Sequence, residues 1–246
     1  MPERLLIVGA TSAIAQAVAR RLAGEGRRLF LVGRDPGKLG AVAEDLGVRG
    51  AVVAGMLIVD LDDVSRHEEI LDRAETALGG VDAILVAHGV LGDQTACERD
   101  WAQAERVIRT NFLGTASLLS RAANRFERRG SGTLVVISSV AGERGRQSNY
   151  VYGASKGALS LFLQGLRNRL HRKGVRVVTV KVGLVDTPMT AHLDKGLLFA
   201  SPDTVGRGIA RVLDGGGDVI YLPWFWRPIM AVIRAIPEQV FKRLRL

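Results

Sequence analysis

The sequence is poor in cysteine, in aromatic residues and in long apolar runs. Cys97 is its single cysteine, which excludes an intrachain disulfide and fits a reducing compartment. No run of about 18 apolar residues occurs, so no membrane-spanning helix is expected. The chain passes from Met1-Pro2-Glu3-Arg4 straight into an apolar stretch, which leaves no room for a signal segment. We therefore expect a cytoplasmic protein.

Nucleic-acid binding and metal binding find little support in the composition. Aromatic residues make up 5% of the chain and do not alternate with basic ones, so a stacking platform for bases is not indicated. The four histidines lack metal-ligand spacing, and one cysteine cannot complete a site, so no metal is expected. The formal net charge of +9 leaves open an anionic membrane surface or a phosphorylated ligand, with a solvated basic surface as the default.

The chain of 246 residues, 47% of them hydrophobic, suits one α/β domain. Short apolar runs alternate with segments of helical periodicity, which predicts a doubly wound, mainly parallel sheet with helices on both faces. Seven strands are expected, at 4–8, 28–32, 51–59, 81–87, 132–138, 176–182 and 219–222. One helix is expected to follow the turn at 9–15 and to run to about 22, and others are expected at 36–46, 64–78, 98–128, 150–173 and 201–213.

The turn after the first strand has the form of a phosphate-binding turn. Strand, tight turn and helix follow one another, and this geometry sets backbone N–H groups and a helix N-terminus where a pyrophosphate binds. Gly9 alone remains of the three glycines usual in such turns, with Ala13 and Ala15 at positions that need small residues. A purely structural turn is the competing interpretation.

The second strand ends in Gly33-Arg34-Asp35, where a dinucleotide-binding unit contacts the adenosine ribose. Gly33 leaves space and Arg34 offers a guanidinium fork for a 2′-phosphate, which favours NADP(H). Asp35 leaves NAD(H) open, and a solvated Arg-Asp turn is the alternative.

Further polar residues follow later strands or lie within a helix. Asp60, at the end of the third strand, lies on the ligand side of the sheet or caps the helix that starts near Asp63. His88-Gly89 follows the fourth strand at the same edge. Asn111 lies inside the long expected helix, either as a group that holds water near a lysine or as a core amide with its partners satisfied.

Tyr152 and Lys156 stand one helical turn apart on one face of the helix that carries them. A neighbouring ammonium favours the phenolate, so the pair suits proton transfer in carbonyl or alcohol chemistry. Chance gives only about 0.07 matches to this spacing. Ser138 and Ser139, which end the fifth strand, point to opposite faces, so one of them looks into the ligand crevice.

The segment 223–246 differs from the rest of the chain. Apolar residues recur at helical spacing among arginines and lysines, after Trp224-Phe225-Trp226. Such a segment lies on an anionic bilayer, covers the substrate cleft or forms a subunit contact, and the sequence does not decide among these.

Taken in order and spacing, these motifs resemble the short-chain dehydrogenase/reductase family over essentially the whole chain. They are the glycine turn, Asp60, Asn111, Ser139 thirteen residues before Tyr152, and the Tyr152-x-x-x-Lys156 pair. The segment 183–187 resembles the family's loop at the nicotinamide. In the glycine turn, Val8 replaces the usual threonine, and Ala13 and Ala15 replace two glycines. Val86-Ala87-His88-Gly89 stands for Asn-Asn-Ala-Gly, and Val182 replaces the proline of Pro-Gly. These departures concern the choice of cofactor more than the catalytic residues.

The resemblance implies an NAD(P)-dependent oxidoreductase acting on CH–OH groups, with a Rossmann-type domain at 1–222 and an extension at 223–246. It implies that Tyr152 exchanges the proton with the substrate oxygen and that Lys156 lowers the pKa of Tyr152 and holds the nicotinamide ribose. Ser139 would bind the substrate oxygen, and Asn111 would complete a water-linked proton relay. The implied cofactor-binding residues are Gly9, Thr11, Ser12, Ala13, Ile14, Arg34, Asp60, Leu61, Ala87, His88, Gly89, Tyr152, Lys156, Gly183, Val185 and Thr187.

Within the family, stretches such as His88-Gly89-Val90-Leu91-Gly92-Asp93 and Met189-Thr190-Ala191-His192 look like decaprenylphosphoryl-2-keto-ribose reductases. This likeness implies a keto sugar on a polyprenyl phosphate as substrate, near Met189 and His192, and a basic tail at the inner face of the membrane. Small soluble carbonyl or 3-oxoacyl substrates, and a non-catalytic dinucleotide-binding regulator, are the alternatives. A homodimer or homotetramer is implied, and no nucleic acid.

Overall fold

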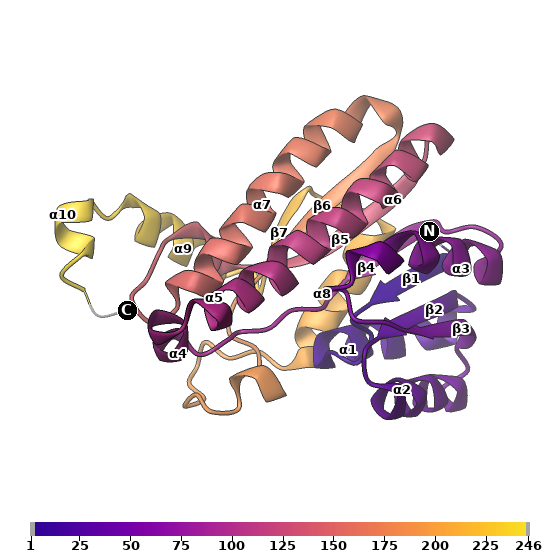
Figure 1. The fold of residues 1–246 in the computed structure, drawn as a ribbon, viewed down its shortest axis with the longest axis horizontal. Coiled ribbons are helices and arrows are strands. Elements are labelled where there is room, and N and C mark those ends of the chain that lie inside the picture. Colours follow the sequence, from indigo (N-terminus) through magenta and orange to yellow (C-terminus); the bar gives the residue numbers. More distant parts are fainter. Residues whose placement is uncertain (1–2, 245–246) are drawn as a thin grey trace.

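The computed structural model describes residues 3–244, which form one seven-stranded parallel sheet in the order β3-β2-β1-β4-β5-β6-β7 (Figure 1). The strands are β1 (Arg4–Val8), β2 (Arg28–Gly33), β3 (Val52–Ile58), β4 (Ala83–Val86), β5 (Gly132–Ser139), β6 (Val175–Val182) and β7 (Val219–Leu222). The chain moves outward from β1 to β3 and then returns to β4 on the other side of β1. This reversal opens a crevice at the carboxyl ends of β1 and β4.

Helices cover both faces of the sheet (Figure 1). One face packs against α1 (Ala13–Leu22), α2 (Pro36–Val48) and α8 (Pro202–Asp214), and the other against α3 (His67–Leu78), α6 (Thr115–Arg129) and α7 (Tyr150–Leu170). Alternate residues of β1 enter opposite cores, with Leu5 and Ile7 in one and Leu6 and Val8 in the other. A central parallel strand is therefore apolar throughout.

The predicted fold class is confirmed, but the single long helix expected at 98–128 is wrong. The structure has α4 (Gln94–Arg99), α5 (Trp101–Ile108), a π-helical segment (Arg109–Gly114) and then α6. Asp100 causes the break, since its backbone is extended and its carboxylate accepts a hydrogen bond from Ala102 N at 3.0 Å. Asp100 thus caps α5 instead of continuing α4.

The segment after β7 forms α9 (Trp226–Ala235) and α10 (Glu238–Phe241), and α9 packs beside the turn that follows β5 (Figure 1). Glu143, at the end of that turn, has a side chain only 3% exposed and meets two cations. Lys181 Nζ of β6 lies 3.2 Å from one carboxylate oxygen, and Arg234 Nε of α9 lies 3.3 Å from the other. One buried carboxylate therefore joins the tail to the sheet.

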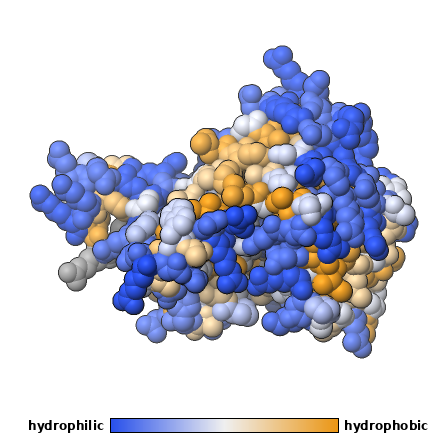
Figure 2. Space-filling view, viewed as in Figure 1, coloured by the Kyte–Doolittle hydropathy of each residue, from blue (hydrophilic) through white to orange (hydrophobic). Residues whose placement is uncertain are grey.

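The surface carries apolar side chains over α7, where Leu161 is 69% exposed (Figure 2). The tail also exposes Trp224, Val232 and Val240. Within residues 3–244, no helix has the length and apolar character needed to cross a membrane.

Candidate active site

A cavity of about 900 Å³ opens at the carboxyl ends of the central strands. Every residue that the sequence and the family resemblance assigned to catalysis, cofactor or substrate lines this cavity, except Asn111. The lining runs from Gly9 and Arg34 at one end to Tyr152 and His192. The fold thus brings together residues that lie far apart in the sequence.

The turn after β1 needs glycine for two reasons. Gly9 has a φ of +78°, and a Cβ there would lie 2.5 Å from the backbone nitrogen of His88. Ser12 begins α1 and accepts a hydrogen bond from Ala15 N at 3.3 Å. With Ala13 and Ile14 also lining the cavity, the amino end of α1 faces the space as a phosphate-binding turn does.

The end of β2 separates the two candidates for adenosine recognition. Arg34 is exposed, lines the cavity and has no ion-pair partner among residues 3–244. Asp35 lies outside the lining, because its carboxylate caps α2 through Lys38 N at 3.0 Å. The cation is therefore free for a ligand, whereas the acid is engaged by its own helix.

The end of β3 settles what Asp60 does with its carboxylate. Asp60 accepts a hydrogen bond from Asp62 N at 3.0 Å, while Asp63 accepts one from Ser65 N at 3.2 Å at the start of the next helical turn. Asp63 is therefore the cap, and Asp60 lines the cavity beside Leu61.

His88 is a half-buried side chain in the segment after β4. Its Nε2 lies 3.1 Å from the carbonyl oxygen of Thr110 and 3.1 Å from Thr115 Oγ1. Burial, together with the nearby charge of Lys156, lowers the pKa of His88 to about 3. Its Nδ1 is buried without a partner and remains available to a ligand.

Asn111 holds the segment after β4 in place, from the π-helical segment. Its Oδ1 accepts from Val90 N at 2.8 Å, and its Nδ2 donates to Val90 O at 2.9 Å and to Ser155 Oγ at 3.0 Å. The side chain is fully buried and outside the cavity lining, so of the two sequence interpretations the satisfied core amide describes its contacts. A Cβ at Gly89 would lie 2.9 Å from Asn111 Oδ1.

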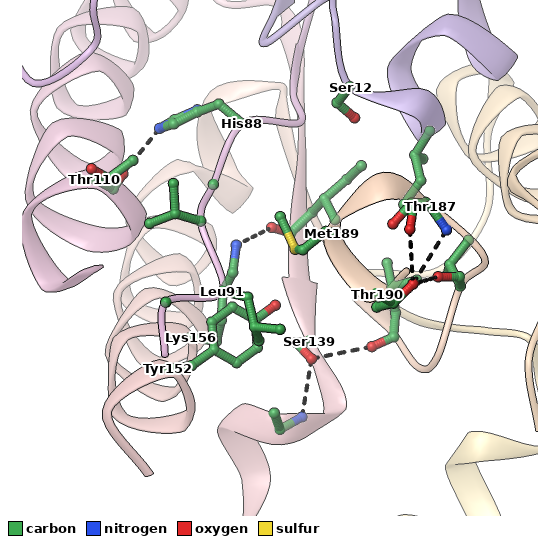
Figure 3. Close-up of a pocket in the computed structure, with 18 of the residues that line it drawn as sticks. Ser12, His88, Leu91, Thr110, Ser139, Tyr152, Lys156, Thr187, Met189 and Thr190 are labelled. Carbon is green, nitrogen blue, oxygen red and sulfur yellow. Dashed lines mark hydrogen bonds between the residues drawn. The ribbon is translucent and has the colours of Figure 1, made fainter. Parts of the chain in front are cut away.

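Helix α7 lies against the turn after β5 in direct backbone contact. A Cβ at Gly142 would lie 2.6 Å from Gly157 N, and one at Gly153 would lie 2.9 Å from the carbonyl oxygen of Ala141. Glycine at these positions lets the two backbones touch, and the contact brings Tyr152 and Lys156 opposite Ser139 (Figure 3).

The two serines at the end of β5 differ in what their hydroxyls contact. Ser138 Oγ donates to Lys156 O at 3.1 Å and contacts Ser160 Oγ at 2.8 Å, so its hydroxyl is hydrogen-bonded to α7. Ser139 Oγ donates to Val182 O at 3.3 Å, accepts from Ala141 N at 3.1 Å and faces the Tyr152 side of the cavity (Figure 3). The structure therefore places Ser139 beside Tyr152.

Lys156 is buried, and Tyr152 is half-buried at the cavity wall. Lys156 Nζ donates to Ile137 O at 3.2 Å and lies 6.0 Å from the centroid of the Tyr152 ring. Burial lowers the pKa of Lys156 to about 8. Burial also raises the pKa of Tyr152, against a smaller lowering by Ser139. The expected lowering of the Tyr152 pKa by Lys156 is therefore reversed here, because lost hydration penalises the phenolate.

The loop after β6 and the tail close the other side of the cavity. A Cβ at Gly183 would clash with the indole of Trp226, so the ring lies directly on this loop. Thr187 and Thr190 cap the turn that carries Met189 toward the cavity (Figure 3). Trp226 in the lining agrees with the interpretation that the tail covers the cleft. Sequence reasoning missed Arg146 and Asn149 as lining residues, since nothing in their spacing links them to Tyr152.

Three comparisons relate this chain and its fold to known proteins. The family description "short chain dehydrogenase" matches residues 3–197. An uncharacterised oxidoreductase of Mycobacterium tuberculosis is 35% identical over 240 residues, which cover 98% of this chain and 96% of that protein. A Burkholderia cenocepacia short chain dehydrogenase solved with NADP has a TM-score of 0.81 at 20% identity, covering 98% of this chain and 97% of that one. An actinorhodin polyketide ketoreductase variant solved with NADPH has a TM-score of 0.80 at 24% identity, covering 89% and 95%.

Burial of Lys156 predicts a pH-dependent stability. Its folded pKa of about 8 lies below the ordinary lysine value of 10.5, so the unfolded chain binds more protons between these pH values and stability rises with pH there. The stability of the wild type relative to Lys156→Met is expected to increase by roughly 2–3 kcal/mol between pH 7 and pH 10, as judged by urea unfolding. Lys173→Met, which removes an exposed lysine, should show no such pH dependence. A pH-independent difference for Lys156→Met contradicts the buried charge.

Proposed function

The chain belongs to the short chain dehydrogenase family, and from this we propose that it is a reductase that uses NADPH to convert a ketone into a secondary alcohol. The observation that carries the proposal is the placement of Tyr152 and Ser139 opposite each other in the cavity, with Lys156 one turn behind (Figure 3). A bound nicotinamide supplies the hydride. The residues of this chain hold the carbonyl oxygen and supply its proton.

The electrostatics of the site favour Tyr152 as a proton donor in the reduction of a ketone. Because burial raises the pKa of Tyr152, its phenol keeps its proton at neutral pH and donates to the carbonyl oxygen as charge develops there. Ser139 Oγ is a second donor to the same oxygen. Lys156, with a pKa of about 8, remains largely an ammonium at pH 7 and stabilises the tyrosinate left after proton donation.

The cofactor preference that we propose is NADP(H) over NAD(H). Arg34 is unpaired at the adenosine end of the cavity, and Asp35 is engaged as the cap of α2. A guanidinium fork fits a 2′-phosphate, which NAD lacks. The NADP and NADPH in the two similar solved structures agree with this choice.

For the substrate, we propose a keto sugar carried on a polyprenyl phosphate, which extends the subgroup likeness of the sequence. The tail supports it, since exposed Trp224 and Val232 lie with Arg227 in a segment whose buried side lines the cavity. Apolar area and positive charge together suit an anionic lipid surface. Reduction of a small soluble carbonyl or 3-oxoacyl compound, or cofactor binding without catalysis, are the alternatives.

Replacing Tyr152 with phenylalanine tests the reaction. Loss of the acid is expected to lower kcat about 10²- to 10⁴-fold in an NADPH oxidation assay over a ketone panel that includes lipid extracts, while the Kd for NADPH stays unchanged. Tyr150→Phe removes the hydroxyl of an exposed neighbour and should keep full activity. Retained turnover in Tyr152→Phe would falsify the assignment, and NADPH binding without turnover of any ketone by the wild type favours the regulator.

Replacing Arg34 with leucine tests the cofactor. The Kd for NADPH is expected to rise about 10- to 100-fold, because a charge-assisted phosphate contact is lost, while the Kd for NADH changes little. Lys38→Leu removes a cation from the first turn of α2 and should leave both constants unchanged. Equal effects of Arg34→Leu on NADPH and NADH in fluorescence titrations speak against a 2′-phosphate contact.

The tail and the α7 surface give the expected partners. Co-sedimentation should be strong with phosphatidylglycerol vesicles, weak with phosphatidylcholine vesicles, and reduced by Val232→Glu, which charges an exposed apolar position of α9. A cytoplasmic protein would make this contact at the inner membrane face.

Light scattering on the protein without vesicles should give two or four times the mass of 26.5 kDa, consistent with the exposed Leu161 surface on α7. Equal binding to both vesicle types, or a monomer mass, contradicts the respective proposal.

A further inference from the structure

Arg146 lines the cavity and has no counterion among residues 3–244. It is partly buried, and its Nε is shielded from solvent with no hydrogen-bond partner. No carboxylate of residues 3–244 lies within ion-pair distance of it. Desolvation lowers the pKa of Arg146 with no opposing acid. A partly buried guanidinium without a counterion lowers the stability of the fold unless a bound anion pairs with it.

Arg144, two residues earlier in the same loop, shows the contrast. Its guanidinium lies 2.7 Å from Glu238 and 4.2 Å from the ring centroid of Phe241, so residues of the tail pair with its charge. Arg144 does not line the cavity, whereas Arg146 does. The loop therefore directs one arginine to the tail and the other to the ligand space.

Asn149 places a second unsatisfied group next to Arg146. Asn149 N donates to Arg146 O at 3.1 Å, which closes a turn between the two residues. Asn149 occupies the N-terminal cap position of α7, yet its side chain makes no capping bond, and Oδ1 is buried without a partner. Asn149 O also accepts from Gly153 N at 2.8 Å, so the turn is continuous with the helical turn that carries Tyr152.

The acids of the lining do not neutralise this corner. Asp60 lies at the end of β3, on the adenosine side with Arg34. Asp93 caps α4, accepting from Ala96 N at 2.7 Å. Tyr152 thus shares its cavity with a guanidinium that no acid of residues 3–244 pairs and with an amide that can donate or accept.

We propose that the substrate of this enzyme carries an anionic oxygen group, a carboxylate or a phosphate, close to its ketone, and that Arg146 binds this group with the help of the Asn149 amide. The inference rests on the proposed reductase function and narrows its substrate class. An arginine offers a planar fork matched to either anion. The contact would orient the ketone toward Tyr152 from the side opposite the adenosine end.

Matched ketone pairs test the anion contact. The probes are acetoacetate with methyl acetoacetate, levulinate with methyl levulinate, and dihydroxyacetone phosphate with dihydroxyacetone, so the arms separate carboxylate from phosphate. The wild type should prefer the anionic member of at least one pair by about 10-fold or more in kcat/KM. Arg146→Gln should remove that preference through KM, with about a 10- to 100-fold loss on the anionic member and little change on the neutral one.

Two further variants and a binding measurement complete the test. Arg146→Lys should recover part of the preference, and Arg144→Gln, which removes the same charge from the same loop, should keep it. Calorimetric titration of each pair into protein loaded with NADP⁺ measures binding without turnover. Tighter binding of the anionic member in this titration, combined with no reduction of either member in the NADPH assay, supports the Arg146 contact and contradicts the proposed reaction. Equal binding and turnover of both members by the wild type, or equal losses on both members in Arg146→Gln, overturn the inference.

Discussion

Direct backbone contact between α7 and the turn after β5 is the constraint on which the site depends. The contact is closer than any side chain allows, as the Cβ positions of Gly142 and Gly153 demonstrate. It holds the helix that carries Tyr152 against the strand that ends in Ser139, and it buries Lys156 beneath them. The relative position of acid, second donor and ammonium is therefore set by main chain, which is stiffer than a set of side-chain contacts.

The same closeness removes water from charged groups and sets the chemistry of the site. Lys156 and Tyr152 both shift toward their neutral forms, and His88 is held neutral beside them. Such a site is less stable than an apolar one of the same shape, which is a common property of catalytic centres. The surrounding cores on the two faces of the sheet supply the stability that this arrangement requires.

Local patterns in the sequence were sufficient for the sheet and for most of the site. Apolar runs such as 5–8 and 83–86 mark strands buried on both faces, and the Tyr152-Lys156 spacing marks one helical face. The break at Asp100 was missed because a capping aspartate and a helical aspartate look alike in a long periodic segment. Arg146 and Asn149 were missed for another reason. Their place in the cavity depends on how the β5–α7 loop folds back, which no spacing encodes. The direction of the Tyr152 pKa likewise depends on burial, which a helical pattern does not measure.

The contact of Trp226 with the Gly183 loop has an optical consequence. Trp101 and Trp224 are 69% and 75% exposed, whereas Trp226 is 5% exposed and has an indole N–H that is buried without a partner at the cavity wall. The chain has three tryptophans, so the blue-shifted part of its emission belongs to Trp226. The protein thus carries an intrinsic fluorophore inside its own ligand space, and the two solvated indoles serve as an internal reference for it.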